Sequence, residues 1–279
     1  MRSATSCMPR GSRSRTLPRA RAGRSELSRM ARQPRGRDGE WVVGRNPVVE
    51  ALRARVPAGE LYVATGAGSD SRVREAVQSA ADARCPIVEV PRRELDRLTG
   101  GATHQGLALK LTAYDYAHPD DLLAVAREAG APPLVVALDG ITDPRNLGAV
   151  VRSAAAFGAH GVVVPERRAA GMSTAAWKAS AGAAARLRVA RAVNLSRQLT
   201  VYAKAGLTIV GLDADGPVSL AEVRRGDEGL VLVIGAEGRG LGRLVSEKCD
   251  LLARIPISRD TESLNASVAA GIALYELTW

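Results

Sequence analysis

The stretch Leu134-Val135-Val136-Ala137-Leu138-Asp139-Gly140-Ile141-Thr142-Asp143-Pro144-Arg145-Asn146-Leu147-Gly148 decides the fold of this chain. Its first five residues form an uninterrupted apolar run, which is typical of a strand buried on both faces of a parallel sheet. A polar turn follows, and then an expected helix at 146–157 that Gly158 closes. Because parallel sheets bind ligands beyond the carboxyl ends of their strands, we expect functional residues in this turn and its equivalents.

The same alternation of strand and helix continues to the end of the chain. We expect strands at 161–165, 207–212, 230–234 and 251–255, and further helices at 195–205 and 263–277. Such alternation predicts an α/β fold, a parallel sheet with helices on both faces, over residues 134–279.

A smaller α/β pattern precedes this block and predicts a separate domain at 39–116. Its expected helices lie at 48–55 and 72–83, and its expected strands at 60–64, 87–90 and 106–111. The polar stretch 117–133, which contains Pro119, Pro132 and Pro133, is predicted to be a linker with one short helix.

The positive charge of the chain is concentrated in its first 38 residues. Eleven arginines and two acidic residues there carry +9 of the formal charge of +10, which leaves +1 for residues 39–279. This segment is rich in Ser, Gly and Pro and poor in apolar residues, so we expect a disordered basic tail. Three interpretations remain open: an RNA-binding arm, an upstream start codon with Met30 as the true start, or an organellar transit peptide.

The positions of the cysteines and histidines limit the kinds of disulfide and metal site that the chain can form. The three cysteines and three histidines are scattered singly, which excludes a disulfide framework and a cysteine-based zinc site. The chain has neither an apolar run of about 18 residues nor a signal-peptide core. We therefore expect a cytoplasmic protein that needs no metal and does not enter a membrane.

Three segments carry the residues that chemistry would need. The first contains Asn146, Gly148 and Arg152; the second is Gly235-Ala236-Glu237-Gly238-Arg239-Gly240-Leu241, and the third is Ser263-Leu264-Asn265. A glycine loop after a buried strand suggests close backbone approach to a ligand, but this loop is neither G-x-G-x-x-G nor a Walker motif. Taken singly, Asn146 and Ser263 could be helix N-caps and Arg152 a solvated helix charge.

Together these segments resemble the three motifs of the SpoU/TrmH family within the SPOUT methyltransferases, in the family's order and without a gap over about 134–279. The domain at 39–116, which ends in His104-Gln105-Gly106, is similar to the substrate-binding module that precedes many members. The resemblance implies an RNA 2'-O-ribose methyltransferase that uses S-adenosyl-methionine, has a trefoil-knotted SPOUT domain and forms a homodimer with sites shared across the interface.

The nearest resemblance is to the subgroup that methylates a guanosine ribose in 23S ribosomal RNA, on the segments 167–172 and 178–183. Two alternatives stay open: the same chemistry on transfer RNA or another ribosomal RNA site, and a non-catalytic RNA-binding protein. A nucleotide-dependent oxidoreductase is disfavoured because the chain has no G-x-G-x-x-G.

The resemblance also implies roles for single residues. Arg152 would act on the ribose hydroxyl; a guanidinium with a pKa above about 12 is a reluctant base, so orienting the hydroxyl is physically easier. The residues that would shape the catalytic site are Asn146, Glu237, Ser263 and Asn265, and those that would contact the cofactor are Gly235, Ile255 and Leu264. In the last helix, Val268, Ile272 and Tyr275 recur at helical spacing, which fits either a dimer interface or core packing.

Overall fold

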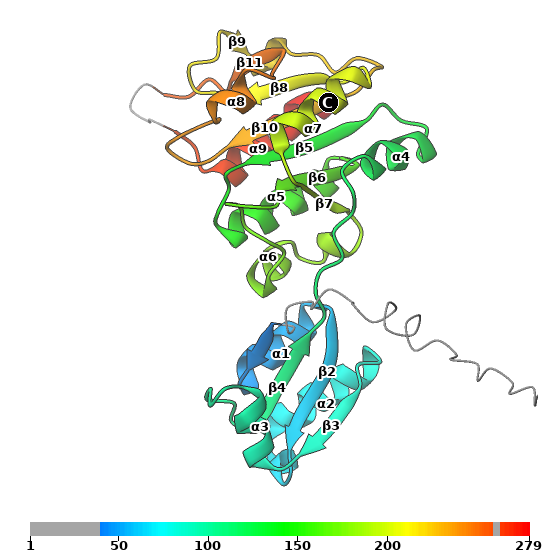
Figure 1. Ribbon diagram of the computed structural model, residues 1–279, viewed down its shortest axis with the longest axis vertical. Helices are drawn as coiled ribbons and strands as arrows, with labels where there is room; N and C mark the ends of the chain where they lie inside the picture. Colours follow the sequence, from blue (N-terminus) through cyan, green and yellow to red (C-terminus); the bar gives the residue numbers. More distant parts are fainter. Residues whose placement is uncertain (1–39, 259–262) are drawn as a thin grey trace, which may run out of the picture. The chain divides into compact units, whose positions relative to one another are not determined.

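The computed structural model describes residues 40–258 and 263–279, so the basic tail predicted at 1–38 lies outside the described residues. The small domain is built on a sheet with strand order β1-β4-β2-β3 (Figure 1). Strands β2 and β3 are parallel, and both β1 and β2 run antiparallel to β4. The elements are β1 (Trp41–Val43), α1 (Arg45–Arg53), β2 (Ala58–Ala64), α2 (Ser71–Asp82), β3 (Ile87–Val90), α3 (Arg92–Leu98) and β4 (Leu107–Leu111).

The sequence predicted five of these elements and missed β1 and α3. Strand β1 has only three residues, too few for a periodic pattern. Helix α3 reads RRELDRL and buries Leu95 alone, so it has no apolar stripe.

The larger domain is built on a sheet with order β7-β6-β5-β10-β8-β11-β9, in which every described neighbouring pair is parallel. Its strands are β5 (Leu134–Asp139), β6 (Gly161–Pro165), β7 (Val189–Ala192), β8 (Thr208–Leu212), β9 (Val218–Ser219), β10 (Leu230–Gly235) and β11 (Leu251–Arg254). Its helices are α4 (Asp121–Glu128), α5 (Pro144–Ala156), α6 (Thr174–Ala179), α7 (Leu195–Lys204), α8 (Arg243–Ser246) and α9 (Ala266–Thr278). The predicted parallel α/β fold is confirmed.

The apolar run at 134–138 is divided between the two faces of this sheet. Leu134, Val136 and Leu138 pack into one hydrophobic cluster, which also contains buried residues of α5, α6 and α9. Val135 and Ala137 pack into a second cluster with residues of α4 and α7. All five side chains are almost fully buried, so the run forms the centre of a three-layer core.

The segment 117–133 is more closely tied to the sheet than a linker would be. The fully buried side chain of Leu122, in the one short helix expected there, joins the second cluster. The Tyr202 hydroxyl donates a hydrogen bond to the Pro119 carbonyl at 2.7 Å. Ala117 forms a parallel bridge with Ala190. The segment therefore covers part of the larger sheet.

Two N-cap assignments considered from the sequence are wrong. Asp143 caps α5 through its side chain, which accepts from the Arg145 amide at 2.9 Å, and Asn146 lies inside the first turn. Asn265 caps α9 by accepting from the amides of Ser267 and Val268, while Ser263 lies two residues outside the cap. The side-chain NH2 groups of both asparagines are thus available for contacts outside their own helices.

Candidate functional site

The carboxyl ends of β5 and β10 lie side by side, with Asp139 paired in register with Gly235. This adjacency brings the turn before α5 next to the glycine loop after β10. The Asp139 carboxylate fastens the two together, because its Oδ2 accepts a hydrogen bond from the Gly242 amide at 2.7 Å. The sequence had not singled out Asp139, although its position at the end of the first buried strand was the available signal.

The three predicted motifs meet in one hydrogen-bond network around the Glu237 carboxylate. Glu237 Oε1 accepts from Asn146 Nδ2 at 2.9 Å, from Asn265 Nδ2 at 2.5 Å and from the Ala266 amide at 3.2 Å. Asn265 Nδ2 also donates to Asn146 Oδ1 at 3.1 Å. Residues as far apart in sequence as Asn146 and Asn265 therefore form one unit, which fixes the start of α5, the glycine loop and the start of α9.

This network also has favourable electrostatics. The Ala266 amide is the first of α9, a helix whose amino end carries a partial positive charge. A hydrogen bond from a helix amino end to a carboxylate oxygen is charge-assisted. Glu237 therefore acts as the common acceptor for donors from α5 and the start of α9.

Two other predicted site residues lie outside the network. Ser263 is exposed and precedes α9. Arg152 is exposed on α5, and its side chain makes no hydrogen bond or ion pair with any residue of 40–258 or 263–279. Asn146 and Arg152 are six residues apart on one helix, which places them about 120° apart around its axis.

The predicted cofactor positions are half-buried segments at the carboxyl edge of the sheet. Gly235 ends β10, Ile255 directly follows β11, and Leu264 precedes α9. Strand β8 lies between β10 and β11, so Leu212 at its carboxyl end lies between the first two positions. Leu212 is half-buried as well, and the sequence had not singled it out.

Gly235 and Gly148 are required by the packing of the chain itself. A Cβ at Gly235 would lie 2.2 Å from the Gly240 carbonyl carbon, because the glycine loop folds back through two hydrogen bonds between Ala236 and Gly240. A Cβ at Gly148 would lie 2.1 Å from the Ala176 carbonyl oxygen. The first glycine therefore permits the tight loop, and the second permits close packing of α5 on α6.

In the small domain, the His104-Gln105-Gly106 segment forms a rigid corner. The buried His104 ring accepts from the Gly106 amide at Nδ1, so that Nε2 carries the proton and donates to Asp96 Oδ1 at 2.8 Å. Gln105 has a φ of 52°, which is uncommon for a residue with a side chain. Its carbonyl accepts from Arg45 Nε at 3.0 Å.

The described residues contain neither a metal-binding cluster nor a membrane-spanning helix. No group of three or more His, Cys, Asp or Glu side chains in 40–258 and 263–279 could hold a metal ion. Within the same part of the chain, no helix combines the length and the apolar character needed to cross a membrane.

The chain is thus a two-domain α/β protein, with a parallel α/β domain that gathers polar motif side chains at its carboxyl edge and a small mixed-sheet domain. Two family models match the chain: the SpoU rRNA Methylase family over residues 133–275, and the RNA 2'-O ribose methyltransferase substrate binding domain over residues 41–117. The chain belongs to the SpoU rRNA methylase family and is an RNA methyltransferase of the SpoU type. The family predicted from the motifs is confirmed.

Curated relatives agree with this assignment. A protein of Mycobacterium sp. strain KMS, called an uncharacterized tRNA/rRNA methyltransferase, is 58% identical over 258 residues, which cover 92% of this chain and 81% of the relative. A Mycolicibacterium smegmatis protein with the same description is 59% identical over 238 residues, 85% of this chain and 76% of its own.

Solved structures share the fold. The SpoU methyltransferase AviRb of Streptomyces viridochromogenes, crystallised in complex with AdoMet, matches with a TM-score of 0.61 and 25% identity over 86% of this chain and 89% of its own. An RNA 2'-O ribose methyltransferase matches with a TM-score of 0.55 and 26% identity over 86% of this chain and 87% of its own.

Proposed function

We propose that the protein methylates the 2'-hydroxyl of a guanosine ribose in 23S ribosomal RNA, uses S-adenosyl-methionine as methyl donor and works as a homodimer in the cytoplasm. The observation that carries the proposal is the network around Glu237, which joins all three motifs at the carboxyl edge of the sheet. Family membership and the AdoMet complex of AviRb support the reaction class and the donor.

The residues at the edge of the sheet suit this cofactor. Gly235, Ile255 and Leu264 offer main-chain polar groups and apolar surface in half-buried positions, as a nucleoside with an amino-acid tail requires. Ile255 directly follows β11, and the Ala266 amide donates to Glu237 in the loop after β10. That this part of the chain forms a trefoil knot stays a prediction.

The methyl donor supplies an electrophilic methyl group on a sulfonium, so the task left to the protein is to aim the ribose oxygen and guide its proton. We assign the aiming to the Arg152 guanidinium, which can donate hydrogen bonds to the ribose oxygen and a neighbouring phosphate. Asn146, Glu237 and Asn265 hold the loops that surround the reacting atoms. Ser263, exposed just before α9, offers a hydroxyl to the RNA.

The homodimer is supported by the outward face of α9. Val268, Ile272 and Tyr275 are 50%, 41% and 57% exposed, so core packing does not explain their helical spacing. The core side of the helix is formed by other residues, among them Ala270 and Leu274. An exposed apolar strip on a helix that starts at the active-site network suits a second copy of the chain as its partner.

A dimer also accounts for Arg152. The residue points about 120° away from Asn146 on the same helix, and it has no partner in the described part of its own chain. We therefore assign Arg152 to the site of a second copy, where its free guanidinium would serve the reaction that Asn146 organises. This arrangement matches the shared site that the family resemblance implies.

Methyl transfer to RNA by the purified protein tests the proposal. We expect transfer of tritiated methyl groups to a 23S ribosomal RNA transcript, with the modified ribose mapped by its resistance to alkaline cleavage. Arg152→Ala should lose at least about a hundredfold in rate with cofactor affinity unchanged. The matched control is Arg188→Ala. Arg188 directly precedes β7, at the amino ends of the strands and away from the proposed site, so this variant should keep full activity. Transfer to a tRNA transcript alone would overturn the ribosomal assignment, and no cofactor binding at micromolar concentration would overturn the enzyme.

A further inference from the structure

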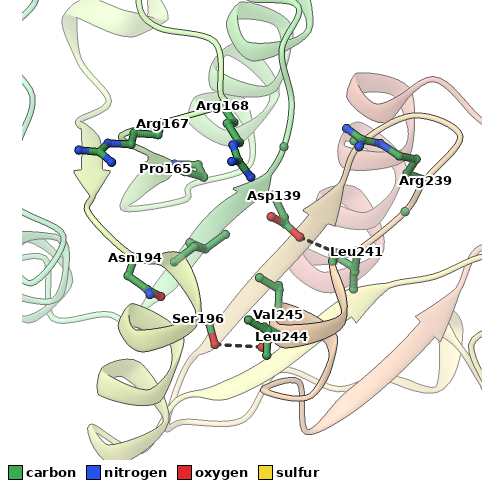
Figure 2. Close-up of a pocket in the computed structure, with 15 residues that line it drawn as sticks. Asp139, Pro165, Arg167, Arg168, Asn194, Ser196, Arg239, Leu241, Leu244 and Val245 are labelled. Carbon is green, nitrogen blue, oxygen red and sulfur yellow. Dashed lines mark hydrogen bonds between the residues drawn. The ribbon is translucent and has the colours of Figure 1, made fainter.

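A cleft of about 580 Å³ opens at the carboxyl edge of the larger sheet (Figure 2). Four chain segments line it, those that follow β5, β6, β7 and β10. Strand order places these segments on the β5 side of β10, whereas the proposed cofactor positions after β8 and β11 lie on its other side. The cleft and the cofactor site therefore share the glycine loop but are otherwise separate.

The lining of the cleft is strongly cationic. It includes the arginines 167, 168 and 239, all exposed, against the single carboxylate of Asp139. None of these three arginines has a hydrogen bond or ion pair with a residue in the described part of the chain. Elsewhere arginines are often paired, as Arg45 is with Asp70 and Arg97 with Glu94. Unpaired guanidiniums gathered from distant segments are the composition expected of an anion site.

The other polar side chains of the cleft already make hydrogen bonds, and of their donors only the Asn194 NH2 group stays free within the described residues. Asp139 accepts from the Gly242 amide, Asn194 caps α7 through the Arg197 amide at 2.9 Å, and the Ser196 hydroxyl donates to the Leu244 carbonyl at 2.9 Å. The free donors of the cleft are therefore mainly guanidiniums. A ligand that satisfies them must be anionic and rich in acceptor oxygens.

Of the three arginines, Arg168 has the most constrained backbone. Its φ of 57° is a left-handed conformation that costs free energy for a residue with a side chain. A hydrogen bond of 2.7 Å from the Ala170 amide to the Ile141 carbonyl ties this loop to the turn after β5. Figure 2 shows the Arg168 side chain directed toward Asp139, while Arg167 extends away from it.

We infer that this cleft binds the phosphodiester backbone of the RNA beside the ribose that is methylated, with Arg168 and Arg239 as its phosphate contacts. The inference rests on the proposed function and adds a binding site to it. Arg239 lies two residues from Glu237 in the same loop, so a phosphate held by Arg239 lies next to the catalytic network. Cationic donors spread over separate segments suit an extended polyanion better than one free phosphate ion.

The test measures the binding of a 23S ribosomal RNA transcript by the full chain over a range of salt concentrations. We expect Arg168→Ala and Arg239→Ala each to raise the RNA Kd about tenfold. Each should also reduce the slope of log Kd against log salt by about 0.7–0.9, the value of one phosphate contact. The arginine-rich tail contributes equally to every variant, so it cancels in these differences. Arg188→Ala is the matched control, since it removes the same charge at the amino ends of the strands, away from the cleft.

Kinetics add a readout that a merely structural effect would not give. In Arg168→Ala we expect KM for RNA to rise with kcat and S-adenosyl-methionine affinity unchanged, and Arg168→Lys should restore the salt slope but only part of the affinity. RNA affinity and slope equal to those of Arg188→Ala would overturn the inference, and so would a loss confined to cofactor affinity. Failure of the proposed function is distinguishable, because the unaltered protein would then transfer no methyl group to the 23S ribosomal RNA transcript.

Discussion

Replacement of Glu237 is the most informative single perturbation of the site. Its Oε1 atom is the common acceptor for Asn146 Nδ2, Asn265 Nδ2 and the Ala266 amide. Glu237→Ala removes this acceptor and leaves three donors without it, whereas Glu237→Gln keeps an oxygen in the same place and removes only the charge. The two variants therefore separate the geometry of the network from its electrostatics.

The expected loss of stability in these variants depends on the exposure of Glu237. Hydrogen bonds to a charged group contribute about 1.5–3 kcal/mol each when buried, but Glu237 is exposed and water can replace the lost acceptor. We therefore expect Glu237→Ala to destabilise the protein by about 1–2 kcal/mol in total. For a domain of this size that lowers Tm by about 2–8 °C. Glu237→Gln should lose less than half of this.

Activity should fall much further than stability. Once the network is broken, the glycine loop and the start of α9 lose their common anchor, and small displacements of reacting groups cost about a hundredfold in rate. Calorimetric Tm values, together with single-turnover methylation rates at saturating cofactor, measure both effects. Equal losses in the alanine and glutamine variants would refute the geometric argument, and full activity in Glu237→Ala would refute any role of the network in catalysis.

Further predictions concern packing, assembly and thiol chemistry. Gly148→Ala should destabilise the protein by about 1–3 kcal/mol in denaturant titrations, because the added Cβ would overlap the Ala176 carbonyl oxygen; an unchanged midpoint would contradict this. Ile272→Asp should shift the protein toward a monomer in sedimentation velocity and abolish transfer, whereas the exposed substitution Arg186→Ala should do neither. Mixing inactive Arg152→Ala and Asn146→Ala proteins should restore about a quarter of the activity, since half of the randomly formed dimers then hold one intact site; no recovery would contradict a shared site. Burial raises the pKa of the Cys249 thiol to about 11, so its alkylation at pH 7.5 should be far slower than that of a free thiol and rise steadily to pH 10, as peptide mapping by mass spectrometry can follow.

The parallel sheet could be predicted from the sequence because its central strands are buried on both faces. β5 and β10 are apolar without interruption, and a short continuous apolar run bounded by turns is typical of such a strand. β7 was missed because it reads Val-Ala-Arg-Ala, with an exposed arginine in an edge strand. β9 has only two residues and carries no pattern. Hydrophobic periodicity thus identifies the centre of a sheet better than its edges.

The site was predictable as a set of loops but not as a network. The sequence named Asn146, Glu237 and Asn265 on family resemblance, and local rules favoured N-cap roles for polar residues at the helix starts. Which side chain caps a helix depends on where the helix begins, and a shift of two or three residues moves the cap from Ser263 to Asn265 and from Asn146 to Asp143. Only the sheet register, which pairs Asp139 with Gly235, explains why the loops meet.

The net charge of the folded part does not reveal where its arginines gather. Residues 39–279 carry a formal charge of only +1, which by itself gives no reason to expect an RNA surface on the folded part. The fold nevertheless brings Arg168 and Arg239, 71 positions apart in the sequence, to one cleft with a single carboxylate. The arginine-rich segment 1–38 can raise affinity for any RNA, because counterion release carries no information about position. Fixed arginines beside the catalytic loop can select which ribose is presented to it, so we expect tail truncation to weaken RNA binding without changing the methylated nucleotide, and Arg168→Ala to relax that choice.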